Sequence, residues 1–175
     1  LYPILMTSSG SLTDATKTAL GAGSLNIKQV IIVGGTSAVS SAVEAEILAT
    51  QVSSVIRIGG TNRQDTAKKM AEKLTGSVAS GGWAWSKAKV SIVTSNNFAD
   101  ALASAQFNGT NASVLLYTAD SVPTETNAYV SEKTVKAALT NVYAIGGTSA
   151  VSATVLQAVD DAGTYAKASP TITAA

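Results

Sequence analysis

The stretch Gly34-Gly35-Thr36-Ser37-Ala38-Val39-Ser40 occurs twice in this chain of 175 residues, the second time as Gly146-Gly147-Thr148-Ser149-Ala150-Val151-Ser152. The two copies are identical and lie 112 residues apart. Upstream of them, Ile4-Leu5-Met6-Thr7 aligns with Leu115-Leu116-Tyr117-Thr118 at an offset of 111 residues. Two matching segments in the same order indicate that a unit of about 110 residues has been duplicated.

Short apolar runs rich in β-branched residues surround these repeats and predict strands. The six runs are residues 4–7, 30–33, 55–58, 90–94, 114–118 and 142–145. They are continuously apolar rather than alternating, which is typical of strands covered on both faces of a parallel sheet. Between them lie helix-start signals: Ser40 and Ser152 can cap helices after the Gly-Gly turns, and Pro123 opens another helix. The alternation predicts an α/β fold with largely parallel strands.

Composition excludes several classes of function. Charged residues make up only 13% of the chain, about half the usual share, and the net charge is +1. A nucleic-acid binder driven by bulk charge is therefore not expected. The chain has no Cys and no His, which excludes disulfides, thiol nucleophiles, Cys/His zinc sites and catalytic triads with a His base. No apolar run reaches the length of a membrane span, and the start at Leu1-Tyr2-Pro3 suggests an internal piece of a longer protein.

Sequence fingerprints of cofactor sites are absent. The Gly-Gly turns follow strands and precede helices, but neither the GxGxxG pattern nor a phosphate loop is present. The next strand ends near Arg57, where a dinucleotide site would carry an acidic residue. We therefore expect no nucleotide, flavin or metal cofactor, and we interpret the glycines as turn residues. The acidic residues are scattered, so the sequence predicts no enzyme.

Two polar segments, residues 57–67 and 95–102, each follow a predicted strand and open a helix. In a parallel sheet such segments gather at the carboxyl ends of the strands, where helix N-termini favour anions and Arg offers a bidentate fork. We predict a noncatalytic anion site formed by these residues: Arg57, Gly59, Gly60, Arg63, Asp65, Asn96, Phe98 and Asp100. The alternative is structural, with Arg57 or Arg63 paired to Asp65 or Asp100 to pin adjacent turns.

These motifs resemble the cell wall binding repeat 2 family of Gram-positive bacteria. The matching segments, in the order of the family pattern, are Arg57-Ile-Gly-Gly-Thr-Asn-Arg63-Gln-Asp-Thr-Ala67, Asn97-Phe-Ala-Asp-Ala-Leu102 and the two Gly-Gly-Thr-Ser-Ala-Val-Ser segments. The resemblance covers about residues 4–160. The sequence departs from the family at Gln64, where the family often has Tyr, and it does not contain three full repeats.

The resemblance implies Rossmann-like α/β repeats that hold an exported protein noncovalently on an anionic cell wall polymer, at the extracellular surface. Family members typically pack three repeats around a pseudo-threefold axis, so other copies of the repeat, in cis or in a homo-oligomer, are implied partners. By this resemblance, residues 1–54 are the C-terminal half of one repeat and residues 55–162 are one nearly complete repeat. Residues 163–175 are a terminal strand or a linker, because Pro170 stands where a strand would repeat.

Two functions from different classes fit this chain. The first is noncovalent anchoring by binding an anionic wall glycopolymer. The second is a structural or adhesive surface-layer domain whose repeats pack laterally without binding polymer directly. Salt-sensitive wall binding would favour the first, because exposed charge interactions are screened by salt.

Overall fold

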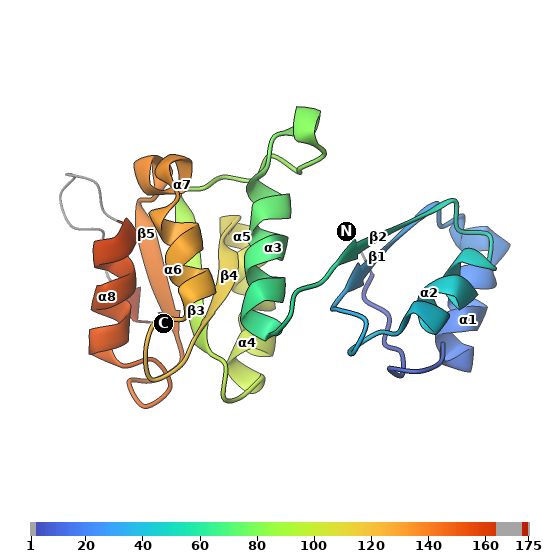
Figure 1. The fold of residues 1–175 in the computed structure, drawn as a ribbon, viewed down its shortest axis with the longest axis horizontal. Helices are drawn as coiled ribbons and strands as arrows, with labels where there is room; N and C mark the ends of the chain where they lie inside the picture. The colour runs from blue at the N-terminus through green and yellow to red at the C-terminus, as the bar shows by residue number, and fades with distance from the viewer. Residues whose placement is uncertain (1–2, 164–172, 175) are drawn as a thin grey trace. The chain divides into compact units, whose positions relative to one another are not determined.

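The computed structural model describes residues 3–163 and 173–174. The chain divides into two compact units, Leu1–Asn62 and Arg63–Ala175, each of which builds its own sheet (Figure 1). Residues 55–62 belong to the first unit because their strand pairs within it. The repeat boundary at 54/55 was placed on sequence similarity alone and stays a prediction.

The first unit is a two-stranded parallel sheet with its helices. It contains α1 (Asp14–Gly21), the 3-10 turn η1 (Gly23–Leu25), β1 (Gln29–Val33), α2 (Ser41–Leu48) and β2 (Ser54–Ile58). The two strands pair in parallel, with Val30 opposite Val55. Its buried apolar core consists of Leu12, Leu20, Ile32, Val43, Ile47 and Val52.

The second unit is a four-stranded sheet with strand order β4-β3-β5-β6, and each pair is parallel. The strands are β3 (Lys89–Thr94), β4 (Val114–Thr118), β5 (Asn141–Ile145) and β6 (Thr173–Ala174). The helices are α3 (Arg63–Thr75), the 3-10 turn η2 (Val78–Ser80), α4 (Ala99–Ala103), α5 (Ala105–Asn111), α6 (Thr124–Ser131), α7 (Lys133–Ala138) and α8 (Ala153–Gly163). The segment predicted as a terminal strand or linker, residues 163–175, includes β6. Its residues 164–172 and 175 lie outside the described part.

Helices cover both faces of this sheet. On one face, α3, α6 and α8 lie side by side and pack on Val90, Ile92 and Leu116 (Figure 1). On the other face, Phe107 of α5 meets Tyr143 of β5 edge to face, with ring centroids 5.0 Å apart. Burial on both faces explains why the strands are continuously apolar. The predicted α/β class is therefore confirmed.

The two copies of the seven-residue repeat have the same local structure. In each, the first glycine ends a strand with a positive φ, 136° at Gly34 and 106° at Gly146. In each, the final serine caps the following helix: the Ser40 Oγ accepts a backbone N–H at 3.3 Å, and the Ser152 Oγ accepts one at 3.2 Å. The duplicated strand–turn–helix predicted from the sequence is thus confirmed.

Five of the six predicted strands are present, but residues 4–7 do not form a strand. Their counterpart in the second unit is β4, which pairs only with β3. The described part of the first unit contains no counterpart of β3, so a strand at residues 4–7 has nothing to pair with. Instead, the Met6 carbonyl accepts hydrogen bonds from the hydroxyls of Thr13 and Thr16, and the Ile4 side chain is 87% exposed. This strand prediction was wrong because pairing, and not β-propensity, decides strand formation.

Candidate functional site

Arg57 is the best-connected side chain of the predicted site. It lies in β2, and its Nε and Nη2 donate to the Glu44 carboxylate at 3.0 and 2.7 Å. Its Nη1 donates to the carbonyls of Gly34 and Val39 at 3.0 and 2.8 Å, and Nη2 also donates to the Ser40 carbonyl at 3.4 Å. All five N–H donors of the guanidinium therefore have partners inside the first unit.

This geometry is that of a clamp that fastens the first Gly-Gly turn to β2. Of the two alternatives drawn from the sequence, the structural one fits Arg57 better, although its acidic partner is Glu44 and not Asp65 or Asp100. A role for Arg57 in polymer binding stays a prediction, and it requires that the guanidinium give up one of these partners.

Gly59 and Gly60 lie where two backbone turns of the first unit cross. A Cβ atom on Gly59 would stand 2.5 Å from the Gly34 carbonyl oxygen. A Cβ atom on Gly35 would stand 2.8 Å from the Gly60 carbonyl oxygen. Packing excludes side chains at Gly59 and Gly35, which gives the predicted site residue Gly59 a structural reason to be glycine.

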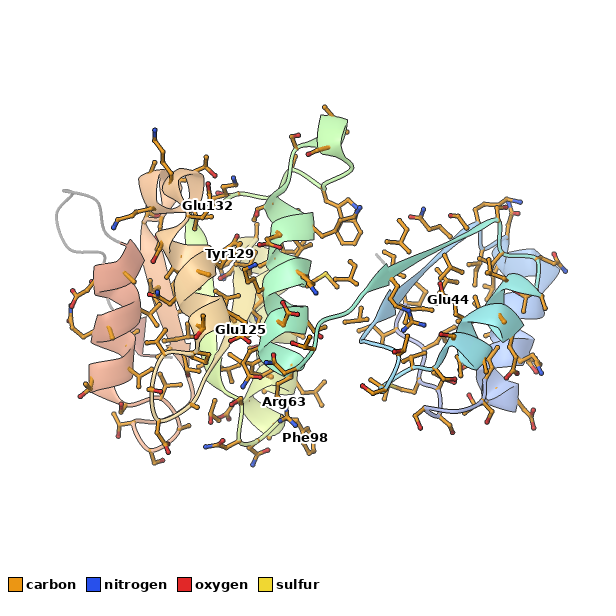
Figure 2. The ribbon with its side chains drawn as sticks, viewed as in Figure 1. Glu44, Arg63, Phe98, Glu125, Tyr129 and Glu132 are labelled. Atoms are coloured by element: carbon orange, nitrogen blue, oxygen red, sulfur yellow. The ribbon has the colours of Figure 1, made fainter. Side chains whose placement is uncertain are left out.

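Arg63 and Asp65 occupy the first turn of α3 in the second unit. The Arg63 Nη1 donates to the Ser95 carbonyl at 2.6 Å, which ties the start of α3 to the turn after β3. The Asp65 carboxylate pairs with Lys69 one turn later at 3.0 Å. Figure 2 shows Arg63 and Phe98 at the same end of this unit. The structure thus brings these residues to the carboxyl ends of the strands, as the sequence predicted.

The segment from Asn96 to Asp100 covers the turn after β3 and the first two residues of α4. The Asn96 N–H donates to the Thr94 hydroxyl at 3.2 Å, and the Phe98 side chain is 75% exposed. The Asp100 carboxylate lies against the second Gly-Gly turn, because a Cβ atom on Gly146 would stand 2.6 Å from its Oδ2. Asp100 therefore packs on the duplicated turn, while the Phe98 side chain is exposed to solvent.

The eight predicted site residues are divided between the two units. Arg57, Gly59 and Gly60 belong to the first, and Arg63, Asp65, Asn96, Phe98 and Asp100 belong to the second. At the carboxyl ends of the strands in the second unit, Arg63 is accompanied by the acidic residues Asp65, Asp100, Asp120 and Glu125. Binding of an anion there would depend on Arg63 and on backbone N–H groups rather than on net positive charge.

The shifted pKa values belong to groups outside the predicted site. Hydrogen bonds from the Thr134 hydroxyl and from the N–H groups of Thr134 and Val135 lower the pKa of Glu132, which caps α7. Burial raises the pKa of Asp160, and the neighbouring charge of Asp161 adds to this effect. A perturbed pKa at these positions reflects capping and burial, so neither group indicates catalysis.

Residues 3–163 and 173–174 contain neither a metal-binding cluster nor a membrane-spanning helix. No cluster of three or more acidic, His or Cys side chains there could hold a metal ion. No helix in this part of the chain has both the length and the apolar character needed to cross a bilayer.

A group of lysines and tryptophans lies at the opposite end of the second unit from the predicted site. Four lysines lie at the amino ends of the strands in the second unit: Lys73, Lys87, Lys89 and Lys133. The loop at residues 76–88, which contains Trp83 and Trp85, lies at the same end. Trp83, Trp85, Lys87 and Lys89 are close together in the sequence, and this clustering was the signal that could have indicated them. Only the tertiary structure places this loop beside α7 and α5.

The duplicated strand–turn–helix and the polar loops at the strand ends are those of an α/β domain built from repeats. The sequence model of cell wall binding domain 2 (CWB2) matches residues 57–156, which is more than half of the chain. The chain belongs to the cell wall binding domain 2 family. The resemblance drawn from the sequence motifs is confirmed.

Individual relatives agree with this assignment. The chain is 32% identical over 154 residues to the N-acetylmuramoyl-L-alanine amidase LytC of Bacillus subtilis (strain 168), covering 87% of this chain and 28% of LytC. Cwp6 from Clostridium difficile is 27% identical with a TM-score of 0.75, over 93% of this chain and 24% of Cwp6. Cwp8 from Clostridium difficile shares the fold at 23% identity and a TM-score of 0.70, over 91% of this chain and 25% of Cwp8. The chain thus spans about a quarter of the length of these relatives.

Proposed function

We propose that this chain anchors a protein noncovalently to the cell wall by binding an anionic wall glycopolymer. The observation that carries the proposal is the match of residues 57–156 to a family of cell wall binding domains. The similarity to LytC, Cwp6 and Cwp8 supports a location at the cell wall or cell surface.

The proposed contact is the carboxyl-end loops of the second unit, with Arg63 as the cation, Phe98 as an exposed apolar contact and Asn96 as a polar one. Asp65 pairs with Lys69 within α3, and Asp100 packs against the Gly146 turn. In the first unit, the proposed contacts are Arg57, Gly59 and Gly60, and the Arg57 guanidinium also holds the neighbouring turn through the Gly34 and Val39 carbonyls. A single site of this kind binds weakly, but several repeats along one polymer raise avidity by roughly 10²–10⁴ when the spacing fits.

We infer that the chain contributes binding and no catalysis. LytC is an amidase, but the similarity covers only 28% of LytC. The reaction of such a protein would then belong to the part of it that this chain does not match. Incubating the chain with purified walls and measuring released amino groups tests this: any turnover above that of a heat-denatured sample contradicts the inference.

Wall binding itself is tested by sedimentation. The chain is mixed with purified Bacillus subtilis walls and with walls from which cold hydrofluoric acid has removed the phosphodiester-linked polymers. We expect binding to intact walls, weaker binding as salt rises through the range that screens exposed charges, and loss of binding to stripped walls. Equal binding to both wall samples at all salt concentrations contradicts the proposed ligand.

The alternative of lateral packing is favoured by one observation. Phe98 and Leu102 are one helical turn apart, and their side chains are 75% and 71% exposed. Apolar side chains in this arrangement can form an interface with another repeat. If this alternative holds, analytical ultracentrifugation should detect self-association that Phe98→Ser abolishes, and wall binding should not depend on the anionic polymer.

A further inference from the structure

Both tryptophans of the chain lie in one loop, residues 76–88, between α3 and β3. The loop folds back on the last turn of α3: the Trp83 N–H donates to the Lys73 carbonyl at 3.0 Å, and the Trp85 N–H donates to the Leu74 carbonyl at 2.8 Å. Both Trp side chains remain partly exposed to solvent.

The loop has a defined backbone. A Cβ atom on Gly82 would stand 2.2 Å from the backbone of Gly76, so only glycine fits this crossing. Gly81 and Ala84 have positive φ values of 78° and 53°. Such conformations persist when the surrounding structure holds them, so the two indole rings are carried by a preorganised support.

Four lysines lie at the end of the second unit that carries this loop, at the amino ends of the strands. A Cβ atom on Gly81 would stand 3.7 Å from the Lys73 Nζ. The Lys87 Nζ donates to the Thr134 hydroxyl on α7, next to Lys133, and the Lys89 Nζ donates to the Asn111 side chain on α5 at 3.3 Å. Figure 2 shows Glu132, which precedes Lys133, at the end of the second unit opposite Arg63 and Phe98.

The nearby acidic groups are engaged elsewhere. Glu72 pairs with Lys68 at 2.8 Å. Glu132 accepts the N–H groups at the start of α7, and the Asp161 carboxylate accepts the Gln157 side chain at 2.8 Å. Within the described part of the chain, none of the four lysines forms an ion pair. The Glu132 carboxylate acts on the Lys87 charge at longer range, but no acidic side chain of the described residues neutralises these ammonium groups by direct contact.

We propose that Trp83 and Trp85, together with Lys73, Lys87, Lys89 and Lys133, form a second contact for an anionic glycopolymer, here called the basic–aromatic edge. An indole ring offers a flat apolar face that can cover a sugar ring, with an N–H at its rim. The ammonium groups supply point charges for the phosphate or carboxylate groups of the polymer. The inference rests on the proposed function for the nature of the ligand, but it assigns the contact to the opposite end of the strands from the predicted site.

Tryptophan fluorescence gives a direct test, because every Trp of the chain lies in this edge. The probe is muramidase-solubilised Bacillus subtilis wall, titrated into the whole chain. We expect a saturable change in Trp emission, in the wild type and in at least one of the single-Trp variants Trp83→Phe and Trp85→Phe. The double variant Trp83→Ala/Trp85→Ala should sediment with intact walls about tenfold more weakly, as is typical when central interface Trp residues are removed.

A charge-matched pair of variants completes the test. Lys87→Gln/Lys133→Gln removes two charges from the basic–aromatic edge, and Lys17→Gln/Lys28→Gln removes two from the first unit. We expect roughly threefold to tenfold weaker wall binding for the first pair and a change of less than about twofold for the second. Far-UV circular dichroism melting must show that all variants remain folded.

The outcomes separate the two proposals. If the wild type binds walls in a salt-sensitive and polymer-dependent way, but Trp emission does not change or the two lysine pairs behave alike, the basic–aromatic edge is overturned and the proposed function stands. If the wild type binds stripped walls as well as intact ones, the anionic ligand is wrong and both proposals fall.

Discussion

Replacing Arg57 by Ala tests whether this residue is a clamp of the fold or a polymer contact. The change removes two hydrogen bonds to Glu44 and three to backbone carbonyls around the first Gly-Gly turn. The side chains of Arg57 and Glu44 are 18% and 30% exposed, so the pair is partly shielded from water. A hydrogen bond to a charged group contributes about 1.5–3 kcal/mol, and removing one partner of a buried pair costs about 3–5 kcal/mol.

Because both side chains are partly exposed, the cost is smaller than for a fully buried pair. We expect Arg57→Ala to lower the free energy of unfolding of the first unit by about 2–4 kcal/mol. A unit of 62 residues has a total stability of roughly 3–9 kcal/mol. Arg57→Ala should therefore leave the first unit only marginally folded. Arg57→Lys should recover little, because an ammonium group cannot reproduce the planar fork.

Hydrogen exchange followed by mass spectrometry is the suitable assay, because it reports on each unit separately. Peptides that cover β1 and β2 should lose protection in Arg57→Ala, while β3 and β5 in the second unit serve as the internal reference. Lys17→Gln removes an exposed ion pair, worth about 0.2–1 kcal/mol, and is the control for a change of charge in the same unit. Unchanged protection together with weaker wall binding would refute the clamp and make Arg57 a ligand-binding residue.

Three further predictions address the turns and the sheets. Gly146→Ala should destabilise the second unit by about 1–3 kcal/mol in urea, because φ is 106° there and Asp100 blocks the Cβ position, whereas Gly147→Ala meets no atom within 4 Å and should be nearly neutral. Glu132→Ala should destabilise more near pH 7 than near pH 3: the capping bonds lower the pKa of Glu132, so its contribution is fully present above the ordinary Glu value and declines as the pH falls toward the lowered one. Urea titrations at both pH values test this. Amides of β1 should exchange faster than those of β5, because β5 has a strand on each side and β1 pairs only with β2 in the described part of the chain.

Much of this protein could be predicted from short-range patterns in its sequence. The repeated Gly-Gly turn predicted the strand–turn–helix in both units because glycine φ values and serine caps are local properties. Continuous β-branched runs predicted five strands, and the order of the motifs predicted the family. These inferences need no knowledge of which distant segments meet.

Long-range contacts decided the rest. Residues 4–7 have the composition of a strand, but a strand needs a neighbour, and none is present for them in the described first unit. The sequence placed Arg57 at a strand end, but only the fold shows that Glu44 and three backbone carbonyls accept hydrogen bonds from its guanidinium. Lys87 and Thr134 are 47 residues apart in the sequence and meet only when the loop before β3 folds against α7. The sequence determines which chemical groups are present, whereas their pairing, and so the groups left for a ligand, depends on how the strands and helices pack.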